Sequence, residues 1–124
     1  EDYAGLVMMS KCQLAQKQYA KAESFAKKAK TVYPQEGQAY YLSGFAKIKQ
    51  KNYASAYEEF KYYENVLPGN PSIIFFKGFS LEGMQRVKES ANQYYEYIQI
   101  VNQGEKAKHA YQRLVEWGYI KKGL

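Results

Sequence analysis

The chain has 124 residues, of which 46% are hydrophobic and 24% are charged, and its formal net charge at pH 7 is +6. This length is enough for a core that buries roughly two-thirds of the unfolded surface, and no apolar run approaches the ~20 residues that a membrane-spanning helix needs. The sequence contains one histidine, His109, and one cysteine, Cys12. An internal disulfide, a multi-histidine metal site and a zinc-protease motif are therefore excluded within this sequence. We expect no cofactor and no catalytic residue.

Residues of the same kind recur every 34 positions along the chain. One set consists of small residues, Ser10, Gly44 and Gly78, at places where two helices must approach each other closely. Further sets share this spacing, namely Tyr19, Tyr53 and Val87; Ala22, Ala56 and Ser90; and Leu6, Tyr40 and Ile74. Such a period indicates a helix-turn-helix unit that occurs three times.

The first unit is predicted to contain helices over residues 3–16 and 20–32. Its first helix is apolar around nearly its whole circumference, as expected of a helix packed between neighbours. Because the sequence also opens without an initiator methionine, we expect a piece of a longer protein in which a preceding helix covers Gly5, Met8 and Cys12. Without that helix, this apolar strip favours self-association through the first helix. Cys12 shares the phase of Ala46 and Ser80, which predicts a small buried residue.

The second unit is predicted over residues 37–50 and 54–66, and the third over residues 71–84 and 88–101. Two-residue connections suit antiparallel helix pairs; they are Lys17-Gln18, Lys51-Asn52 and Gln85-Arg86. Pro34 and Pro68 end the first two units, because proline lacks an amide hydrogen and clashes with the preceding turn. A terminal helix over about residues 105–117 is amphipathic and is expected to cap the last unit, with His109 on its exposed side and Gly118 at its end.

The second unit carries the fullest pattern, with Tyr40, Gly44, Tyr53, Ala56, Phe60 and Pro68. In these residues the chain resembles the tetratricopeptide repeat (TPR) family, from Tyr3 to about Gly104. The first repeat departs from the family pattern at Ala26, where an aromatic residue is usual, and the third repeat has no proline. The resemblance implies a single all-α domain over residues 1–124. This would be a right-handed α-solenoid of three TPR repeats (about 3–36, 37–70 and 71–104) plus a C-terminal capping helix (about 105–117).

The resemblance also implies a concave groove lined by the first helix of each repeat. In the family, the second, fifth, ninth, twelfth and thirteenth places of a repeat usually point into this groove. The groove residues predicted here are Val7, Lys11, Leu14, Tyr41, Phe45, Ile48, Lys49, Phe75, Phe79 and Glu82. The aromatic residues among them are surplus to the apolar stripe that a core requires, so we expect one exposed aromatic floor. Such a patch usually marks an interaction site, unless another part of the full-length protein covers it.

These features predict a non-catalytic module that binds an apolar or aromatic peptide segment of a protein partner in its groove. Lys11 and Lys49 would pair with an acidic residue or a chain-terminal carboxylate at the groove edge. Chaperone-binding TPR domains hold a terminal carboxylate with lysine, asparagine and arginine, and of the corresponding places here only Lys11 has a suitable charge. Carboxylate-clamp recognition is therefore disfavoured. A structural or self-assembly spacer is an alternative, in which the groove binds nothing and the Met8 side of the first helix makes the contacts.

The net charge of +6 raises nucleic acid or an anionic membrane as partners. The lysines of the second helices, however, alternate with glutamates such as Glu23, Glu58 and Glu59. This mixture is typical of a solvated convex face, so we expect neither a nucleic-acid partner nor membrane insertion.

The C-terminal third carries a second resemblance. The runs Pro68-Gly69-Asn70-Pro71, Phe76-Lys77-Gly78 and Tyr111 to Tyr119 are similar to the repeat regions that follow the catalytic domain in some bacterial membrane-associated or periplasmic HExxH zinc metalloproteases. This similarity implies an accessory domain that docks a substrate or partner beside a protease located outside this chain. It touches no catalytic residue. The location would then be periplasmic; the sequence by itself is equally compatible with the cytoplasm.

Overall fold

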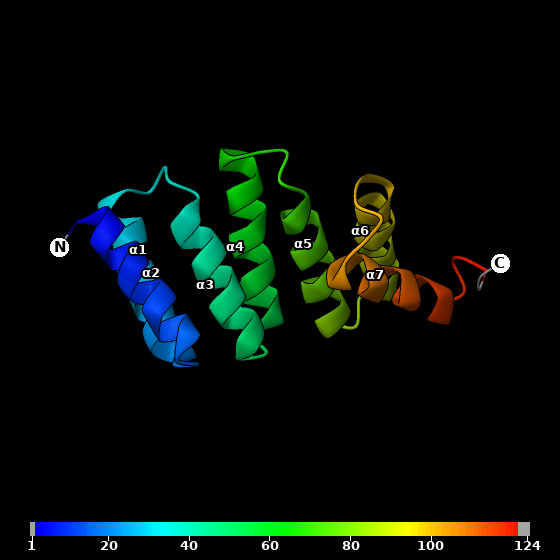
Figure 1. The fold of residues 1–124 in the computed structure, drawn as a ribbon, viewed down its shortest axis with the longest axis horizontal. Coiled ribbons are helices and arrows are strands. Elements are labelled where there is room, and N and C mark those ends of the chain that lie inside the picture. Colours follow the sequence, from blue (N-terminus) through cyan, green and yellow to red (C-terminus); the bar gives the residue numbers. More distant parts are fainter. Residues whose placement is uncertain (1, 122–124) are drawn as a thin grey trace. The chain divides into compact units, whose positions relative to one another are not determined.

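The computed structural model describes residues 2–121 and contains, over this range, seven α-helices and no strand (Figure 1). The helices of the first two repeats are α1 (Tyr3–Ala15), α2 (Tyr19–Val32), α3 (Gln38–Lys49) and α4 (Tyr53–Val66). They are followed by α5 (Pro71–Gly83), α6 (Val87–Ile100) and the terminal α7 (Glu105–Glu116). Every predicted helix is present, and each of its ends lies within one residue of the prediction. The all-α repeat architecture is therefore confirmed.

The chain divides into two compact units, and the division falls where the sequence places the boundary between the second and third repeats. The N-terminal unit is Glu1–Gly69 and the C-terminal unit is Asn70–Leu124. In the N-terminal unit each helix packs against the next, from α1 to α4. In the C-terminal unit α5 packs on α6, and α6 packs on α7.

The two helices of each repeat are joined by the same tight turn. Lys17, Lys51 and Gln85 adopt the left-handed conformation, with φ values of 60°, 61° and 62°. The amide of the next residue then donates to a carbonyl five residues earlier, as from Gln18 to Gln13 at 2.8 Å. This is the Schellman arrangement that closes a helix C-terminus. The recurrence of the turn shows that the repeat extends to the backbone.

Small residues permit the close helix approach that the repeat predicts. A Cβ atom added to Gly44 would lie 2.7 Å from the Phe60 ring, and one added to Gly78 would lie 2.7 Å from the Tyr94 ring. In the first repeat Ala26 takes the place of these rings, which leaves room for a serine at position 10. The Ser10 hydroxyl uses this room to donate a 2.7 Å hydrogen bond to the carbonyl of Ala22.

The core of the N-terminal unit joins the first three helices through Leu6, Val7, Ala26, Ala29, Ala39 and Leu42. Phe25 packs against this cluster from the side. Cys12, by contrast, is exposed, so the prediction of a buried cysteine is wrong. The cause is that the face of α1 holding Met8 and Cys12 is open to solvent in the described chain.

The terminal helix α7 covers α6 with Ala107, Ala110 and Leu114, which are all buried. Gly118 ends the helix with a φ of 84°, and the Tyr119 amide donates to the carbonyl of Leu114 at 2.9 Å. The Trp117 ring stacks on Tyr94 with a centroid distance of 6.0 Å. The predicted capping role of this segment follows from these contacts.

Candidate functional site

The predicted groove residues of the N-terminal unit lie on α1 and α3. Lys11 and Lys49 are exposed, and Leu14, Tyr41 and Phe45 are half-buried. The Lys49 ammonium group lies 5.3 Å from the centroid of the Phe45 ring, which is a cation–π distance. These residues therefore remain accessible and combine aromatic surface with positive charge.

The structure buries Val7 and Ile48, which the sequence expects to face the groove. Val7 is 6% exposed and belongs to the core cluster that includes Ala39 and Leu42 of α3. Ile48 is 8% exposed. Both side chains are short and branched at Cβ, so they fill space close to their own backbone and do not extend past longer neighbours. We assign both residues to the core.

Tyr41 is held by the second helix of its repeat. Its ring meets Phe60 and Tyr63 of α4 edge to face, with centroid distances of 6.0 Å and 5.9 Å. Burial, with a smaller effect from Tyr63, raises the pKa of the Tyr41 hydroxyl. The side chain thus supports the core and still exposes part of its surface. The sequence suggests that Tyr41 is surplus to the core, and the structure corrects this.

On α5, the predicted groove residue Phe75 is a core residue of the C-terminal unit. It is 6% exposed, and its ring lies 5.5–5.9 Å from the rings of Phe76, Phe79, Tyr94, Tyr97 and His109. The expectation of an exposed Phe75 is therefore corrected. The reason is that Tyr94 and Tyr97 of α6 and His109 of α7 all pack against the Phe75 ring, whereas the sequence interpretation treats this side of α5 as open.

Phe79 and His109 form the accessible edge of this aromatic cluster. Phe79 is half-buried, stacks on Phe75 at 5.9 Å and lies 5.4 Å from the His109 ring. The His109 side chain is 32% exposed. The prediction that His109 lies on the exposed side of the cap is wrong, because the ring turns toward α5 and α6.

Glu82 joins the three helices of the C-terminal unit. Its Oε1 atom accepts a hydrogen bond from the Tyr94 hydroxyl at 2.6 Å and lies 2.9 Å from His109 Nε2. Its Oε2 atom lies 2.7 Å from Arg113 Nε. Burial alone would raise the pKa of the Glu82 carboxyl, but hydrogen bonds from His109 and Tyr94 and the Arg113 charge lower it below its usual value. Burial and the bond to Glu82 raise the pKa of Tyr94.

The charge of Glu82 determines which nitrogen of His109 carries a proton. An ionised carboxylate only accepts hydrogen bonds, so Nε2 must be the donor in this contact. In the neutral imidazole Nδ1 is then the acceptor. The fold thereby fixes the orientation and the tautomer of the one histidine in the sequence.

The repeat spacing contains a signal for this cluster that sequence analysis missed. His109 and Arg113 lie 34 residues after Phe75 and Phe79, so they occupy the fifth and ninth places of a further first helix. The prediction treated α7 as a cap without the repeat pattern. Extending the pattern into α7 would have placed both side chains beside α5.

A second polar cluster surrounds Glu59 in the N-terminal unit. The carboxylate is 9% exposed and lies 2.9 Å from Lys30 Nζ of α2 and 2.7 Å from Lys47 Nζ of α3. The Ser43 hydroxyl donates to it at 3.2 Å. Burial acts to raise the Glu59 pKa, but bonds from Lys47 and Lys30 outweigh it and lower the pKa. Glu59 of α4 therefore links α2 and α3 through Lys30 and Lys47. The sequence suggests that Glu59 and Lys30 belong to a solvated face, and the structure corrects this.

Within residues 2–121, no group of three or more histidine, cysteine, aspartate or glutamate side chains is arranged to hold a metal ion. No helix in this range is both long enough and apolar enough to cross a bilayer. The clusters around Glu59 and Glu82 are each held together by ion pairs between residues of different helices. These ion pairs hold the helices in place.

The chain is similar to solved TPR domains. The TPR domain of Arabidopsis OM64 matches with a TM-score of 0.86 and 20% sequence identity, over 94% of this chain and 97% of that domain. The first TPR of Spaghetti (RPAP3), bound to the HSP90 peptide SRMEEVD, matches with a TM-score of 0.85 and 13% identity, over 94% and 92%. The Yersinia enterocolitica type III secretion chaperone SycD, in complex with a peptide of the translocator YopD, matches with a TM-score of 0.77 and 12% identity, over 91% and 86%.

No protein-family model and no curated protein matches the sequence. The resemblance of the C-terminal third to metalloprotease repeat regions therefore stays a prediction.

Proposed function

We propose that this chain, which has the tetratricopeptide-repeat fold, is a non-catalytic module that binds an apolar or aromatic segment of a protein partner along its first helices. The observation that carries the proposal is the state of Tyr41 and Phe45 on α3. Both rings are half-buried, so each is held in place by the fold and keeps surface for a ligand. Rigid aromatic anchors of this kind dominate binding energies at protein interfaces.

The charges beside these rings define the chemistry of the partner segment. Lys49 lies over the Phe45 ring, and Lys11 has no ionic partner among the residues that the structure describes. An acidic side chain next to an apolar anchor would pair with either lysine. The partner is thus a short helix or extended stretch with two or three apolar anchors and an acidic group, one of the recurring modes of peptide recognition.

Two of the similar solved structures are complexes with peptides, one from HSP90 and one from the translocator YopD. They support peptide binding as an activity of this fold. The partner of this chain is expected to differ from a peptide that is held by its terminal carboxylate, because only Lys11 matches the basic places of a carboxylate clamp. The accessible aromatic rings favour recognition of apolar side chains.

The test is selection of a random-sequence peptide library, displayed on phage, against the wild-type chain and two groups of variants. Phe45→Ala and Tyr41→Ala remove the rings on α3, and Phe79→Ala removes the accessible ring on α5. Tyr95→Ala is the matched control, since this second-helix tyrosine is 53% exposed. Lys27→Glu tests the basic surface of α2.

The selected peptides should carry aromatic or large aliphatic residues. We expect Phe45→Ala to weaken their binding by about 2 kcal/mol or more, the scale of an interface hot spot, and the two controls to change it little. Loss of binding in Lys27→Glu with binding retained in Phe45→Ala would contradict the proposal. It would place the site on the basic second-helix surface instead.

A further inference from the structure

The first helix exposes an apolar face in the described structure. Met8 is 59% exposed and Met9 is 45% exposed, and Gly5 beside them is also exposed. A hollow of about 280 Å³ lies among Asp2, Gly5, Leu6, Met8 and Met9. Adjacent exposed methionines beside a hollow form a patch, and such a patch, unlike a single exposed apolar residue, marks an interaction surface.

The internal repeat shows that this is a helix-docking face. The residues 34 positions later on α3 are Ala39, Leu42 and Ser43, and each is at most 7% exposed. They are buried because α2 packs on α3, with Ala26 and Ala29 in the same core cluster as Ala39 and Leu42. The equivalent face of α1 therefore has the shape to receive another helix.

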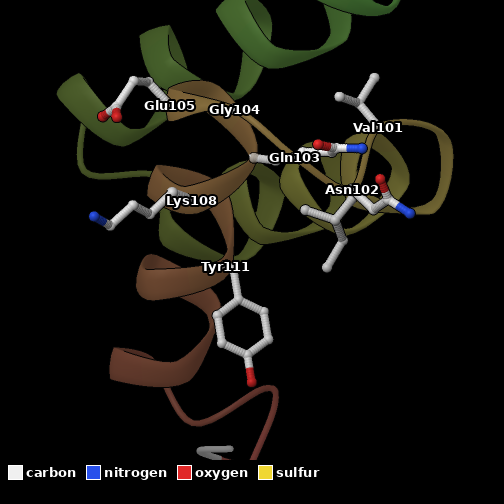
Figure 2. A pocket seen from close by; sticks show the side chains of 9 residues that line it. Val101, Asn102, Gln103, Gly104, Glu105, Lys108 and Tyr111 are labelled. Carbon is white, nitrogen blue, oxygen red and sulfur yellow. The ribbon is translucent and has the colours of Figure 1, made fainter.

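The terminal helix α7 has an open outer face of its own. Tyr111 is 39% exposed and stands between two hollows. The larger, of about 530 Å³, has Ile98, Val101, Ala107 and Tyr111 among its apolar lining residues, and Asn102, Gln103, Glu105 and Lys108 among its polar and charged ones. Figure 2 shows Tyr111 projecting from α7 below the loop that carries Val101 to Gly104. The smaller, of about 330 Å³, is lined by Tyr111, Gln112, Val115 and Glu116.

This face of α7 is not shaped for the close helix pairing seen within the repeats. Gln112 occupies the place that Gly44 and Gly78 hold in the second and third repeats. Those glycines let a buried ring approach the helix backbone, whereas a glutamine side chain keeps a neighbour at a distance. The hollows on either side of Tyr111 therefore suit inserted side chains better than a closely packed second helix.

We propose that the open face of α1 in one copy of this chain docks against the outer face of α7 in a second copy, head to tail. Methionine is unbranched and flexible and fits irregular hollows, so Met8 and Met9 would enter the hollows beside Tyr111. The Tyr111 ring would in turn enter the hollow beside Met8. Each face thus offers projections and hollows to the other, as in knobs-into-holes packing.

The charges at the helix starts favour this pairing. Asp2, at the start of α1, uses one oxygen to cap the helix by accepting from the Gly5 amide at 3.0 Å. Lys108, near the start of α7, has no ionic partner within residues 2–121. The first turn of α7 also carries Glu105 and Lys106, so it has a net positive charge of one, and when the two helices lie parallel Asp2 of α1 faces Lys108.

The pairing joins two different faces, so a dimer would leave one copy of each face open. A contact of this heterologous kind repeats from copy to copy and gives rings or open chains, so the assembly is larger than a dimer. The faces share no residue with the proposed groove. Loss of assembly and loss of peptide binding are therefore separable.

The test is sedimentation velocity of three proteins, with circular dichroism to verify folding. The average mass of the wild type should rise continuously with concentration. Met8→Glu blocks the α1 face and Tyr111→Glu blocks the α7 face, so each variant alone should remain monomeric. Their equimolar mixture should form a one-to-one dimer and nothing larger, because each variant supplies the face that the other lacks. Tyr95→Glu, at an exposed site on α6, is the control and should assemble like the wild type.

The contribution of the contact between Asp2 and Lys108 to the association constant is measured with two variants. Asp2→Asn keeps a capping side chain, and Lys108→Gln removes the positive charge. Each should weaken association by about two- to fivefold, as for an exposed ion pair, and the double variant should be no weaker than either single one. A monomeric wild type, or a mixture of the two face variants that stays monomeric, would overturn the proposal. So would dimerisation of Tyr111→Glu alone, which would indicate that two α1 faces pair with each other.

Discussion

Replacement of Gly44 by leucine tests the helix pairing on which the repeat depends. A Cβ at this position would lie 2.7 Å from the Phe60 ring, whereas carbon atoms in contact normally stand about 3.5–4.0 Å apart. The ring cannot retreat freely, because Phe60 is completely buried and Tyr41 packs against it. Overpacking of this kind costs about 1–3 kcal/mol, and we expect Gly44→Leu to fall in the upper part of that range.

Thermal unfolding followed by circular dichroism measures this cost. For a unit of this size each kcal/mol lowers Tm by about 4–8 °C, so Gly44→Leu should lower it by at least about 4 °C. Ala54→Leu adds bulk at an exposed position of α4 and should leave Tm nearly unchanged. In a Phe60→Ala background, where the ring is gone, Gly44→Leu should cost much less than in the wild type. An unchanged Tm for Gly44→Leu, or full additivity of the two changes, would refute the pairing of α3 with α4 at this point.

The two titratable clusters give further predictions for stability. The Glu82 pKa is depressed on folding, so its ionised form contributes stability that is present above the unfolded pKa of about 4.3 and is lost as the pH falls through the folded value. Glu82→Gln should therefore destabilise the chain by about 1–3 kcal/mol at pH 7 and flatten the loss of stability below about pH 4.3 in urea titrations; an unchanged acid limb would contradict this. Glu59→Gln should act in the same direction, because it leaves Lys30 and Lys47 without their carboxylate. Glu58→Gln, on the exposed neighbour, is its matched control and should have little effect in the same titration.

The repeat period predicts the features of this fold that depend on local sequence. A 34-residue spacing of small and bulky residues is sufficient to locate each helix to within a residue, because the same turn and the same helix crossing recur. The close approaches at Gly44 and Gly78 follow for the same reason. These are contacts between neighbouring helices in sequence, and their pattern is visible in the order of residues.

The candidate site was harder to predict, because exposure depends on what lies against a helix face. Phe75 and Phe79 occupy equivalent kinds of place in the sequence, yet Phe75 is buried and Phe79 is half-buried. His109 of α7 lies against both rings, and Phe75 is in addition packed against Tyr94 and Tyr97 of α6. The burial of Glu59 is likewise invisible in the sequence, since it requires lysines from two other helices to converge on one carboxylate.

The two units consequently use the same repeat places for different purposes. In the C-terminal unit, the fifth and ninth places of α5 are contacted by its own terminal helix, and Glu82 is held by Tyr94, His109 and Arg113. In the N-terminal unit, the corresponding rings of α3 have a lysine beside them and an accessible edge. A partner segment at Phe79 would lie beside a carboxylate, Glu82, whose charge His109 and Arg113 already offset, whereas a segment at Phe45 meets Lys49, which can pair with its acidic group. Phe45→Ala should therefore weaken the selected peptides more than Phe79→Ala does, and the opposite order would place the principal anchor beside α7.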